Sequence, residues 1–412
     1  MYDYIYQLYI TKNAVINIMK KTKNRFTTSF RPGYFKKTLI ILIAIIAISC
    51  KKQAPVNLDE NPDNFSKIFT QFWDKMNNQY VYWDKDNTDW DAIYKQYKPL
   101  FDNLSNSNSD KLKAVTYFRE ITRNLIDNHF RITFKDPAIS NLTINPATDR
   151  KSKASNFHSR FNYDNVVKTY LDNGYLSGNG TASIENTVIN ATAGTINNNL
   201  LYFHCNLFAL KQSYESNDGN KVKQILDYFF AQLKRTSNQI KGIILDLRNN
   251  TGGNIIDLNF FAGKLVSNDI TFGYTRSKSG LGKLDYLPWL EAKLKHDTDY
   301  AVNVPVILLG DNFSASLSET TIIALRNSKN ILIGEQTYGA TGPLSDAGIF
   351  NSGSFSIGNF MEVTTSATEF KGLNDTFYEN VGIKPDIVSP FNLRELLAGK
   401  DTQLELAISQ LK

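Results

Sequence analysis

The spacing of apolar and polar positions divides this chain into a front part with helical periodicity and a rear part in which strands alternate with helices. In the front part, apolar residues recur every three or four positions from Phe65 to Tyr80, from Ala92 to about Asp102 and from Leu112 to Leu125, which predicts three amphipathic helices. Pro99 is expected to kink or shorten the second helix. Residues 64–128 therefore form a predicted helical domain.

The rear part contains short, continuous apolar runs that end in turns rich in Gly, Asn or Ser, which is typical of buried strands. The expected strands are Ile189–Leu207 (a strand, a turn and a second strand), Ile240–Leu247, Val304–Leu309 and Ile331–Ile333, with a hairpin at Ser352–Thr365. The expected helices are Val222–Leu233, Ile255–Leu265 and Leu317–Asn327. This alternation predicts an α/β domain over residues 191–412 with a mostly parallel sheet. Residues 129–190 are expected to supply linking strands and a polar segment.

Composition and charge indicate a globular protein and argue against a nucleic-acid-binding one. The chain has 412 residues, 42% of them hydrophobic, which indicates a globular protein with a sizeable core. The net charge is +6, but residues 1–49 hold eight of the 46 basic and one of the 40 acidic side chains. The remaining 38 basic and 39 acidic residues give a net charge of −1. The basic patch expected of a nucleic-acid binder is therefore missing, and we expect no nucleic-acid partner.

The first 49 residues read as an export signal. Lys36-Lys37 precede an apolar run, Leu39–Ile48, that is too short to span a bilayer, and small residues lead to Cys50. This ending resembles a bacterial lipobox, which would make Cys50 a lipidated first residue and residues 50–63 a tether. An ordinary signal peptide cleaved nearby is the alternative. The expected location is the bacterial cell envelope, with the lipid-anchored domain in the periplasm or on the cell surface.

The two cysteines, Cys50 and Cys205, leave no disulfide framework if Cys50 is acylated. We find no His or Cys set at metal-ligand spacing, and we expect neither a metal nor a cofactor.

Ser316 is the strongest candidate for chemistry. It lies in a loop of small residues between the strand at Val304–Leu309 and the helix that begins at Leu317. This order lifts a hydroxyl clear of the sheet and places it at the positive end of a helix, where developing negative charge is stabilised. The alternative is structural, because Ser316-Leu-Ser-Glu319 fits a capping box, in which the serine only caps the helix.

A serine nucleophile also needs a base and oxyanion donors. Among the four histidines, His204 is expected in the core, and His158 and His296 in solvated loops. His129 stands between a helix and a strand, a junction that can project a side chain into a cleft, although a lone histidine there can also be structural.

Backbone amides after the buried strand Ile240–Leu247 are candidate oxyanion donors. Gly252-Gly253 opens the following helix, and the amide of Leu317 is the natural second donor. The alternative is that these glycines form an ordinary tight turn.

Three stretches taken together resemble the tail-specific, or C-terminal processing, peptidases of family S41. They are Lys241–Gly253 (KGIILDLRNNTGG), Ser314–Glu319 (SASLSE) and Gly334–Gly339 (GEQTYG), and Val381–Asp386 (VGIKPD) resembles the closing motif of the family. The resemblance implies an αβ sandwich of the crotonase/ClpP kind, preceded by the small helical domain. It also implies a serine endopeptidase acting on peptides or on exported or envelope proteins.

One departure selects a branch of the family. In the serine–lysine branch a lysine base follows the T-x-G turn, but here Ala340 holds that place and Lys329, the nearest lysine, is expected to be solvated. The stretch Leu125–Phe130 resembles the one that carries the histidine in the tricorn-core Ser-His-Glu branch. By that resemblance His129 is the base and Glu379 the acidic residue that orients it.

A second departure concerns the PDZ domain that many members contain. The roughly 55 residues between Phe134 and Ile189 are mostly polar and too few for a PDZ fold, which needs about 80. Two alternatives to the peptidase remain. One is a catalytically silent relative that binds peptides or apolar ligands, and the other is acyl-CoA chemistry on the same fold, which an export signal argues against. The oligomeric state is left open.

Overall fold

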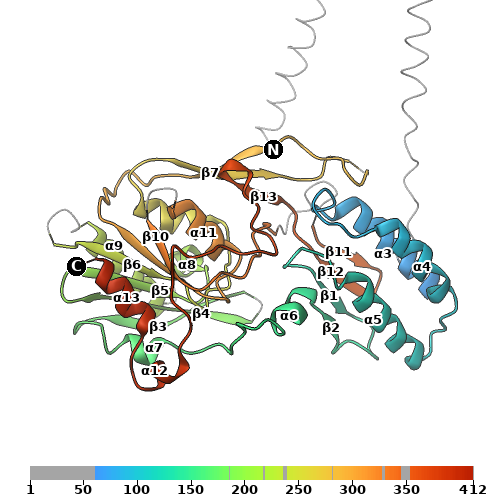
Figure 1. Ribbon diagram of the computed structural model, residues 1–412, viewed down its shortest axis with the longest axis horizontal. Helices are drawn as coiled ribbons and strands as arrows, with labels where there is room; N and C mark the ends of the chain where they lie inside the picture. The colour runs from blue at the N-terminus through green and yellow to red at the C-terminus, as the bar shows by residue number, and fades with distance from the viewer. Residues whose placement is uncertain are drawn as a thin grey trace, which may run out of the picture. The chain divides into compact units, whose positions relative to one another are not determined.

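The computed structural model describes residues 61–184, 186–216, 219–234, 239–280, 282–326, 330–344 and 353–411 (Figure 1). The predicted leader, Cys50 and Lys329 lie outside the described residues. Asp59–Lys412 form one compact unit. Across the ranges above, every helix is too short or too polar to cross a bilayer.

The three helices predicted for the front part are present as α3 (Phe65–Gln79), α4 (Trp90–Asp102) and α5 (Asn108–Thr122). Each begins after a residue whose side chain accepts a hydrogen bond from the first turn, namely Asn64, Asp89 and Ser107, as N-caps do. The helix α4 continues past Pro99 to Asp102, so Pro99 does not shorten it. The rings of Phe69 and Phe101 stack with centroids 4.5 Å apart and hold α3 on α4.

These helices pack on a small antiparallel sheet that draws strands from both ends of the chain. Its order is β11 (Phe355–Ile357), β12 (Met361–Thr364), β1 (Arg131–Phe134) and β2 (Thr143–Ile144) in the described residues. The predicted hairpin at Ser352–Thr365 thus pairs with the strand that follows His129, with Arg131 opposite Thr364. We call residues 61–144 with 355–364 the helical lobe.

The larger part of the unit, here the main lobe, is built on a sheet with seven strands in the described residues. Their order is β14 (Ile387–Val388), β10 (Ile331–Gly334), β9 (Val306–Gly310), β6 (Gly242–Asp246), β5 (Leu200–Cys205), β4 (Thr187–Ile196) and β3 (Leu176–Ile184). The pairs from β14 to β5 are parallel, and β4 and β3 are antiparallel. The predicted parallel α/β core is confirmed. The edge strand β3 was not predicted, because its sequence, LSGNGTASI, is polar.

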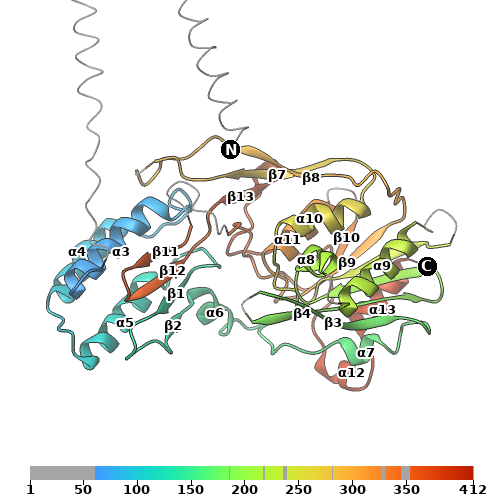
Figure 2. The same cartoon turned by 180° about the vertical axis from the view of Figure 1, so that it is seen from behind.

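Helices cover both faces of this sheet (Figures 1 and 2). One face carries α8 (Leu210–Glu215), α9 (Lys221–Leu233), α10 (Ile256–Phe261) with the 3₁₀ turn Ala262–Leu265, and α11 (Leu317–Arg326). The other carries α7 (Asp164–Val167), α12 (Leu393–Leu397) and α13 (Thr402–Gln410). The parallel strands are therefore buried on both sides, as their continuous apolar runs require.

The stretch before the serine segment is not a plain loop. It forms β7 (Ile270–Arg276) and β8 (Leu290–Leu294), which join β13 (Glu369–Gly372) in a separate antiparallel sheet. The guanidinium of Arg276 contacts the carboxylates of both Glu369 and Asp84, so this sheet is also tied to the helical lobe. The polar segment after β2 contains another helix, α6 (Pro146–Lys151).

A buried ion network fixes the turn that follows β6. Arg248, fully buried, bonds Asp246 on β6 at 2.9 Å and Asp401, the N-cap of α13, at 2.9 and 2.8 Å. Because a buried charge is costly unless it is paired, this network holds α13 on the sheet. It also holds the start of the loop that leads to Gly252.

Candidate active site

Ser316 lies where the predicted strand, loop and helix meet, at the carboxyl end of the parallel strand β9. The loop that carries it is anchored by Ser314, whose hydroxyl donates to Leu247 O at 2.8 Å, and by the amide of Ala315, which donates to Asn250 O at 3.0 Å. The backbone of Ser316 has φ +57°, a left-handed conformation that is rare for residues other than Gly, Asn and Asp. The structure therefore holds this serine in a strained turn directly before α11.

Of the two hydrogen bonds that make up a capping box, the structure contains one. The carboxylate of Glu319 accepts a hydrogen bond from the amide of Ser316 at 3.2 Å, which is one half of the box. The other half is missing, because the Ser316 hydroxyl makes no hydrogen bond with any residue that the structure describes. The hydroxyl is thus not used as a cap.

Glu319 accepts hydrogen bonds from several groups besides the amide of Ser316. It is fully buried, and its carboxylate also accepts from the Thr337 hydroxyl at 2.5 Å and from the amides of Gly339 and Ala340 at 2.6 and 2.7 Å. Burial raises the pKa of this carboxyl, and the hydrogen bonds oppose that shift. Glu319 thus fastens the 337–340 loop to the helix that begins beside Ser316.

Of the two glycines after β6, Gly252 approaches the serine closely, whereas Gly253 approaches the backbone of Phe208. A Cβ at Gly252, where φ is +94°, would lie 2.6 Å from the Ser316 Cβ and 2.8 Å from the Leu317 amide nitrogen. The amide of Gly252 donates to Asn250 Oδ1 at 2.8 Å, so that donor is already used inside the loop. Among the described residues, the amides of Gly253 and Leu317 have no such partner. Of the three candidate oxyanion donors, the amides of Gly253 and Leu317 are therefore the ones that remain available.

Ala340 lies in the place where the serine–lysine branch has its base. Its side chain is buried, 2% exposed, and its amide is bonded to Glu319. A methyl group cannot accept a proton, so a base for Ser316 must come from another element.

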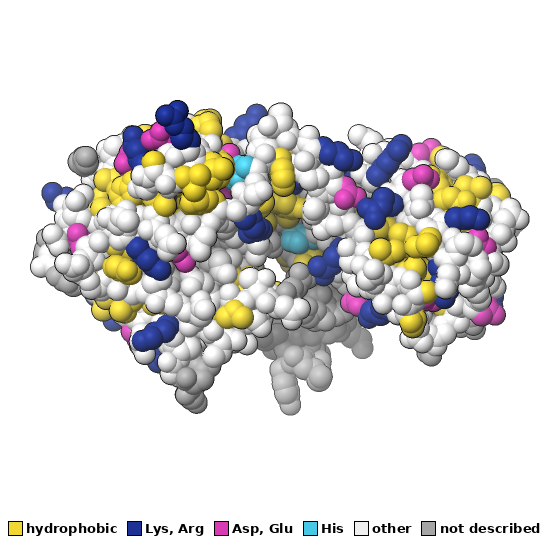
Figure 3. All heavy atoms as spheres, turned by 90° about the horizontal axis from the view of Figure 1, so that it is seen from below, with side chains coloured by type: hydrophobic (Ala, Val, Ile, Leu, Met, Phe, Trp, Pro, Cys, Tyr) yellow, Lys and Arg dark blue, Asp and Glu magenta, His cyan; other side chains and the backbone are white. Residues whose placement is uncertain are grey.

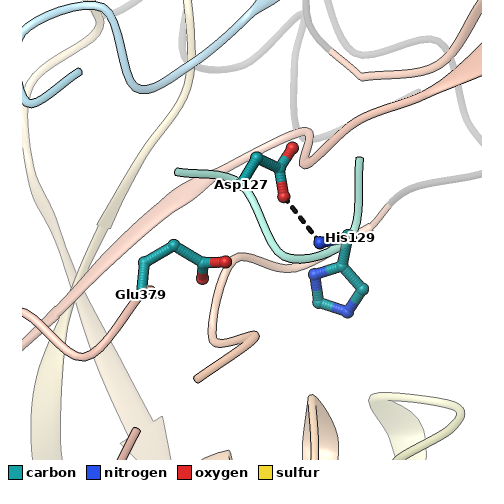
Figure 4. A group of neighbouring side chains, drawn as sticks. All are labelled: Asp127, His129 and Glu379. Atoms are coloured by element: carbon teal, nitrogen blue, oxygen red, sulfur yellow. Dashed lines mark hydrogen bonds between the residues drawn. The ribbon is translucent and has the colours of Figure 1, made fainter. Parts of the chain in front are cut away.

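His129 follows α5 and precedes β1, as the sequence predicted. Its backbone amide donates to the Asp127 carboxylate at 2.9 Å, which closes a tight turn (Figure 4). The imidazole projects from the other side of that turn, away from Asp127 (Figure 4). Asp127 is itself buried and accepts from Thr365 Oγ1, Ser366 Oγ and the Ser366 amide at 2.7, 2.9 and 2.8 Å. The turn that presents His129 is therefore rigidly held.

Glu379 lies beside His129 but makes no hydrogen bond to its ring in this structure. One ring nitrogen of His129 and one carboxylate oxygen each of Asp127 and Glu379 lie within 4.8 Å of one another. Glu379 accepts instead from the amides of Asn128, Thr341 and Gly342 at 2.8, 2.7 and 2.9 Å, from Thr341 Oγ1 at 3.2 Å and from the Tyr82 hydroxyl at 3.2 Å. Burial and the neighbouring charge of Asp127 raise the pKa of Glu379 to about 8.

By residue type, Asp127, His129 and Glu379 can also be read as a metal-binding set. Both carboxylates direct their oxygens at backbone amides and hydroxyls, however. A cation would have to displace these donors from buried positions, at a cost of about 1–3 kcal/mol for each donor left unpaired. The residues present fit a hydrogen-bonded turn better than a metal site.

The 337–342 loop connects the serine with the histidine. On one side, the amide of Tyr338 donates to Ser314 O at 2.9 Å. On the other, the side chain of Asn128 donates to Tyr338 O and Gly339 O at 3.2 and 2.8 Å. No hydrogen bond joins the Ser316 hydroxyl to His129 among the described residues. The loops that carry the two groups are thus both bonded to the 337–342 loop.

The other histidines are less suited to the role of base. His204 is in the core as predicted, with Nδ1 2.9 Å from Asp246 O. The expectation that His158 is solvated was wrong, because it pairs with Glu335 at 2.8 Å and stacks on Phe391 with centroids 3.9 Å apart. His296 is half-buried and contacts Tyr300 O at 2.8 Å.

Several residues of the site were not found from the sequence. Asp127 stands two positions before His129 in the stretch that carries the resemblance, and its position there was the available signal. Tyr82, Arg150 and Lys151 come from distant elements, and no local pattern distinguishes them. Arg150 donates to the side-chain oxygens of Asn128 and Asn380 at 3.0 and 3.2 Å, and so joins the residues beside His129 and Glu379.

Comparison with known proteins supports the family resemblance and the fold. The family model described as "Peptidase family S41" matches residues 200–389, and that of the "Tricorn protease C1 domain" matches residues 62–109. Residues 200–389 are a peptidase family S41 domain. The S41 resemblance and the αβ fold class predicted from the sequence are both confirmed.

A curated relative of the S41 domain is the carboxy-terminal-processing protease of Bartonella bacilliformis, 29% identical over 180 residues. The match covers 42% of this chain and 36% of the relative, so the chain spans little more than a third of that protein.

Two solved structures share the fold. A candidate peptidase from Parabacteroides merdae has a TM-score of 0.65 and 22% identity over 85% of this chain and 97% of its own. Mature CPAF in complex with lactacystin has a TM-score of 0.57 and 8% identity over 84% and 98% of the two chains.

The contact between Gly252 and Ser316 gives a first prediction for the S41 domain. Replacing Gly252 by Ala should lower the free energy of unfolding by about 1–3 kcal/mol more than the same change at Gly174. Both glycines have φ +94°, but a Cβ at Gly174 meets nothing within 4 Å. Urea unfolding of the two full-length variants measures the difference, and equal losses would mean that the close approach to Ser316 carries no cost.

The raised pKa of Glu379 gives a second prediction. Because the folded-state pKa of about 8 lies above the ordinary 4.5, the folded chain holds a proton that the unfolded chain has released between these values. The stability from this group is complete below about pH 4.5 and is lost as the pH rises through 8, by at most about 1.4 kcal/mol per pH unit. Urea unfolding from pH 5 to 9 should show this fall in the wild type and not in Glu379→Gln. Parallel curves would contradict it.

Proposed function

We propose that this protein is a serine endopeptidase that hydrolyses peptide bonds of exported or envelope proteins. The observation that carries the proposal is the setting of Ser316. Its hydroxyl stands directly before α11 and has no hydrogen-bond partner among the described residues, and the same holds for the amides of Leu317, the next residue, and of Gly253, which follows the glycine that approaches Ser316. Such a hydroxyl beside paired amide donors is what attack on a carbonyl group requires.

In the proposed reaction, Ser316 Oγ attacks the carbonyl carbon of the peptide bond while His129 takes the hydroxyl proton. The negative charge moves to the carbonyl oxygen, which the amides of Gly253 and Leu317 hold. His129 then gives its proton to the departing amine as the C–N bond breaks, which leaves an acyl ester on Ser316. A water molecule hydrolyses the ester by the same steps, and the hydroxyl is restored.

The role of His129 requires that it come within hydrogen-bond distance of Ser316. The contacts that support it are those of the 337–342 loop, which binds Asn128 on one side and the Ser316 loop on the other. Hydrogen bonds between catalytic groups often tighten only when substrate binds. When the imidazole takes the proton, its positive charge near Glu379 favours the ionised carboxylate, which would stabilise the imidazolium.

The central prediction concerns Ser316→Ala. This change should abolish hydrolysis of peptides by the full-length chain and change the free energy of unfolding by less than about 1 kcal/mol, because the hydroxyl caps nothing. Cleavage of a peptide library, read by mass spectrometry, and urea unfolding measure the two effects. Activity that survives in the variant would remove Ser316 from the mechanism.

A second candidate function is a catalytically silent S41-like protein that binds peptides. The specific observation in its favour is that no hydrogen bond joins the Ser316 hydroxyl to His129 among the described residues. A fluorophosphonate probe separates the two, since it labels an activated serine in the folded wild type and not in Ser316→Ala. Absence of labelling in folded wild-type protein would favour the silent binder.

We also propose that the protein is anchored to the bacterial envelope by a lipid on Cys50. The support is the order of basic flank, short apolar run and small residues before that cysteine. Expressed in a bacterial host, the full-length chain should fractionate with membranes, and Cys50→Ala should be released from them. Cys205→Ala is the matched control, because Cys205 is buried in the sheet and its loss should not alter the fraction. Identical fractionation of all three forms would contradict the anchor.

A further inference from the structure

Two cations next to the serine loop lack a carboxylate partner among the described residues. Lys151 ends α6, and its Nζ lies 4.6 Å from the centre of the Tyr338 ring. Arg160 places its guanidinium carbon 4.5 Å from the centre of the Phe313 ring and donates to Asn249 O at 3.1 Å. Phe313 lies three residues before Ser316, and the amide of Tyr338 is bonded to Ser314 O. Both charges therefore lie on rings that belong to the immediate surroundings of the nucleophile.

The nearby carboxylates are not available to neutralise these charges. Glu319 and Glu379 are buried and bonded to backbone amides and hydroxyls. Asp311 accepts from the amides of Asn249 and Phe313 at 3.0 and 2.9 Å. These three carboxyl groups are thus buried and bonded within the loops, and none of them forms an ion pair with Lys151 or Arg160.

The surface is consistent with this arrangement. One face of the unit is hollowed between the helical lobe and the main lobe, and Lys and Arg side chains lie on both sides of the hollow (Figure 3). Arg160 also lines a cavity of about 700 Å³ together with Asp164, His204, Asn249 and Thr251. Thr251 directly precedes Gly252, so this cavity borders the loop of the candidate oxyanion donors. An arginine that lines such a cavity without an ion-pair partner among the described residues attracts ligands of negative charge.

We propose that Lys151 and Arg160 bind carboxylates of the peptide substrate beside Ser316, so that the enzyme prefers acidic peptides; this proposal rests on the proposed peptidase function. The carboxylate has two sources in a peptide, an Asp or Glu side chain or the free C-terminus. Arg150, next to Lys151, is not part of the subsite, because its guanidinium is committed to Asn128, Asn380 and Arg123 O. It acts as a positioning residue for the His129 turn.

A structural role is the rival interpretation, since a cation over an aromatic ring also stabilises packing, by about 0.5–1 kcal/mol at exposed sites. The two interpretations differ in what they predict for substrates. Loss of a packing contact affects all peptides alike. Loss of a carboxylate-binding cation raises KM for acidic peptides alone.

The test uses internally quenched peptides that differ only in Glu or Gln near the cleaved bond, each with a free or an amidated C-terminus. With the full-length wild type, KM should be about tenfold lower for the Glu form, the free-acid form or both, as expected for one charge-assisted hydrogen bond. The pair that shows the difference identifies the source of the carboxylate. The preference should weaken as salt is added.

In Lys151→Gln or Arg160→Gln the preference should fall by about tenfold, with KM for the neutral, amidated peptide unchanged. Lys151→Arg should retain it. Lys153→Gln is the matched control, an exposed lysine two residues away on the same segment. Equal KM values for all four peptides in the wild type, or an equal loss on acidic and neutral peptides in the variants, would overturn the proposal.

Binding to the Ser316→Ala chain, followed by fluorescence anisotropy of the same peptides, separates this proposal from the peptidase itself. If no peptide is cleaved by the wild type but acidic peptides bind in a Lys151-dependent manner, the peptidase fails and the carboxylate subsite stands. If neutral and acidic peptides are cleaved and bound equally well, the peptidase stands and the subsite fails.

Discussion

The arrangement around the serine depends on one buried carboxylate, that of Glu319. It accepts hydrogen bonds from the amide of Ser316 and from the hydroxyl and amides of the 337–340 loop, all in a place closed to water. Each of these donors would be left unsatisfied without it, at a cost of about 1–3 kcal/mol per group. Because no other acceptor among the residues that the structure describes is bonded to these amides, Glu319 fixes the distance between the serine turn and the loop beside it.

The longer 337–342 loop, of which these residues are part, is in turn bonded to the helical lobe. Its carbonyls at Tyr338 and Gly339 accept from the Asn128 side chain, and its amides at Thr341 and Gly342 are bonded to Glu379. Glu379 in turn accepts from the Asn128 amide and from the Tyr82 hydroxyl of the helical lobe. The carboxylates of Glu319 and Glu379 thus link the loop of Ser316 to the turn of His129 through the 337–342 loop. This is a common design in enzymes, where a second layer of hydrogen bonds orients the reacting groups.

The absence of a lysine at position 340 fits this network. The Ala340 side chain is buried against the loop, and its amide is committed to Glu319. A lysine there would have to bury an ammonium among these bonds. With alanine, the loop instead serves as a spacer that binds Asn128, the neighbour of His129. The charges of the site are also segregated, with carboxylates enclosed and the cations Lys151 and Arg160 outside them.

The sequence by itself determined the local elements and the candidate residues. The helices of the front part, the parallel strands and the serine turn follow from apolar periodicity and from caps, because these signals act over a few neighbouring residues. The family motifs also lie within single stretches, so Ser316, His129 and Gly253 could be named as candidates without coordinates. The polar edge strand β3 and the β7–β8 pair were missed, since their stability comes from pairing with distant partners and not from their own pattern.

Only the tertiary structure decided which of these stretches meet. The return of β12 to pair with β1 and the bonds from Asn128 to the carbonyls of Tyr338 and Gly339 depend on contacts between residues hundreds of positions apart. The same holds for the placement of Lys151 over Tyr338 and Arg160 over Phe313. A one-dimensional pattern records which side chains are apolar or charged. Which buried donor meets which acceptor depends on packing in three dimensions, because hydrogen bonds and desolvation act through space.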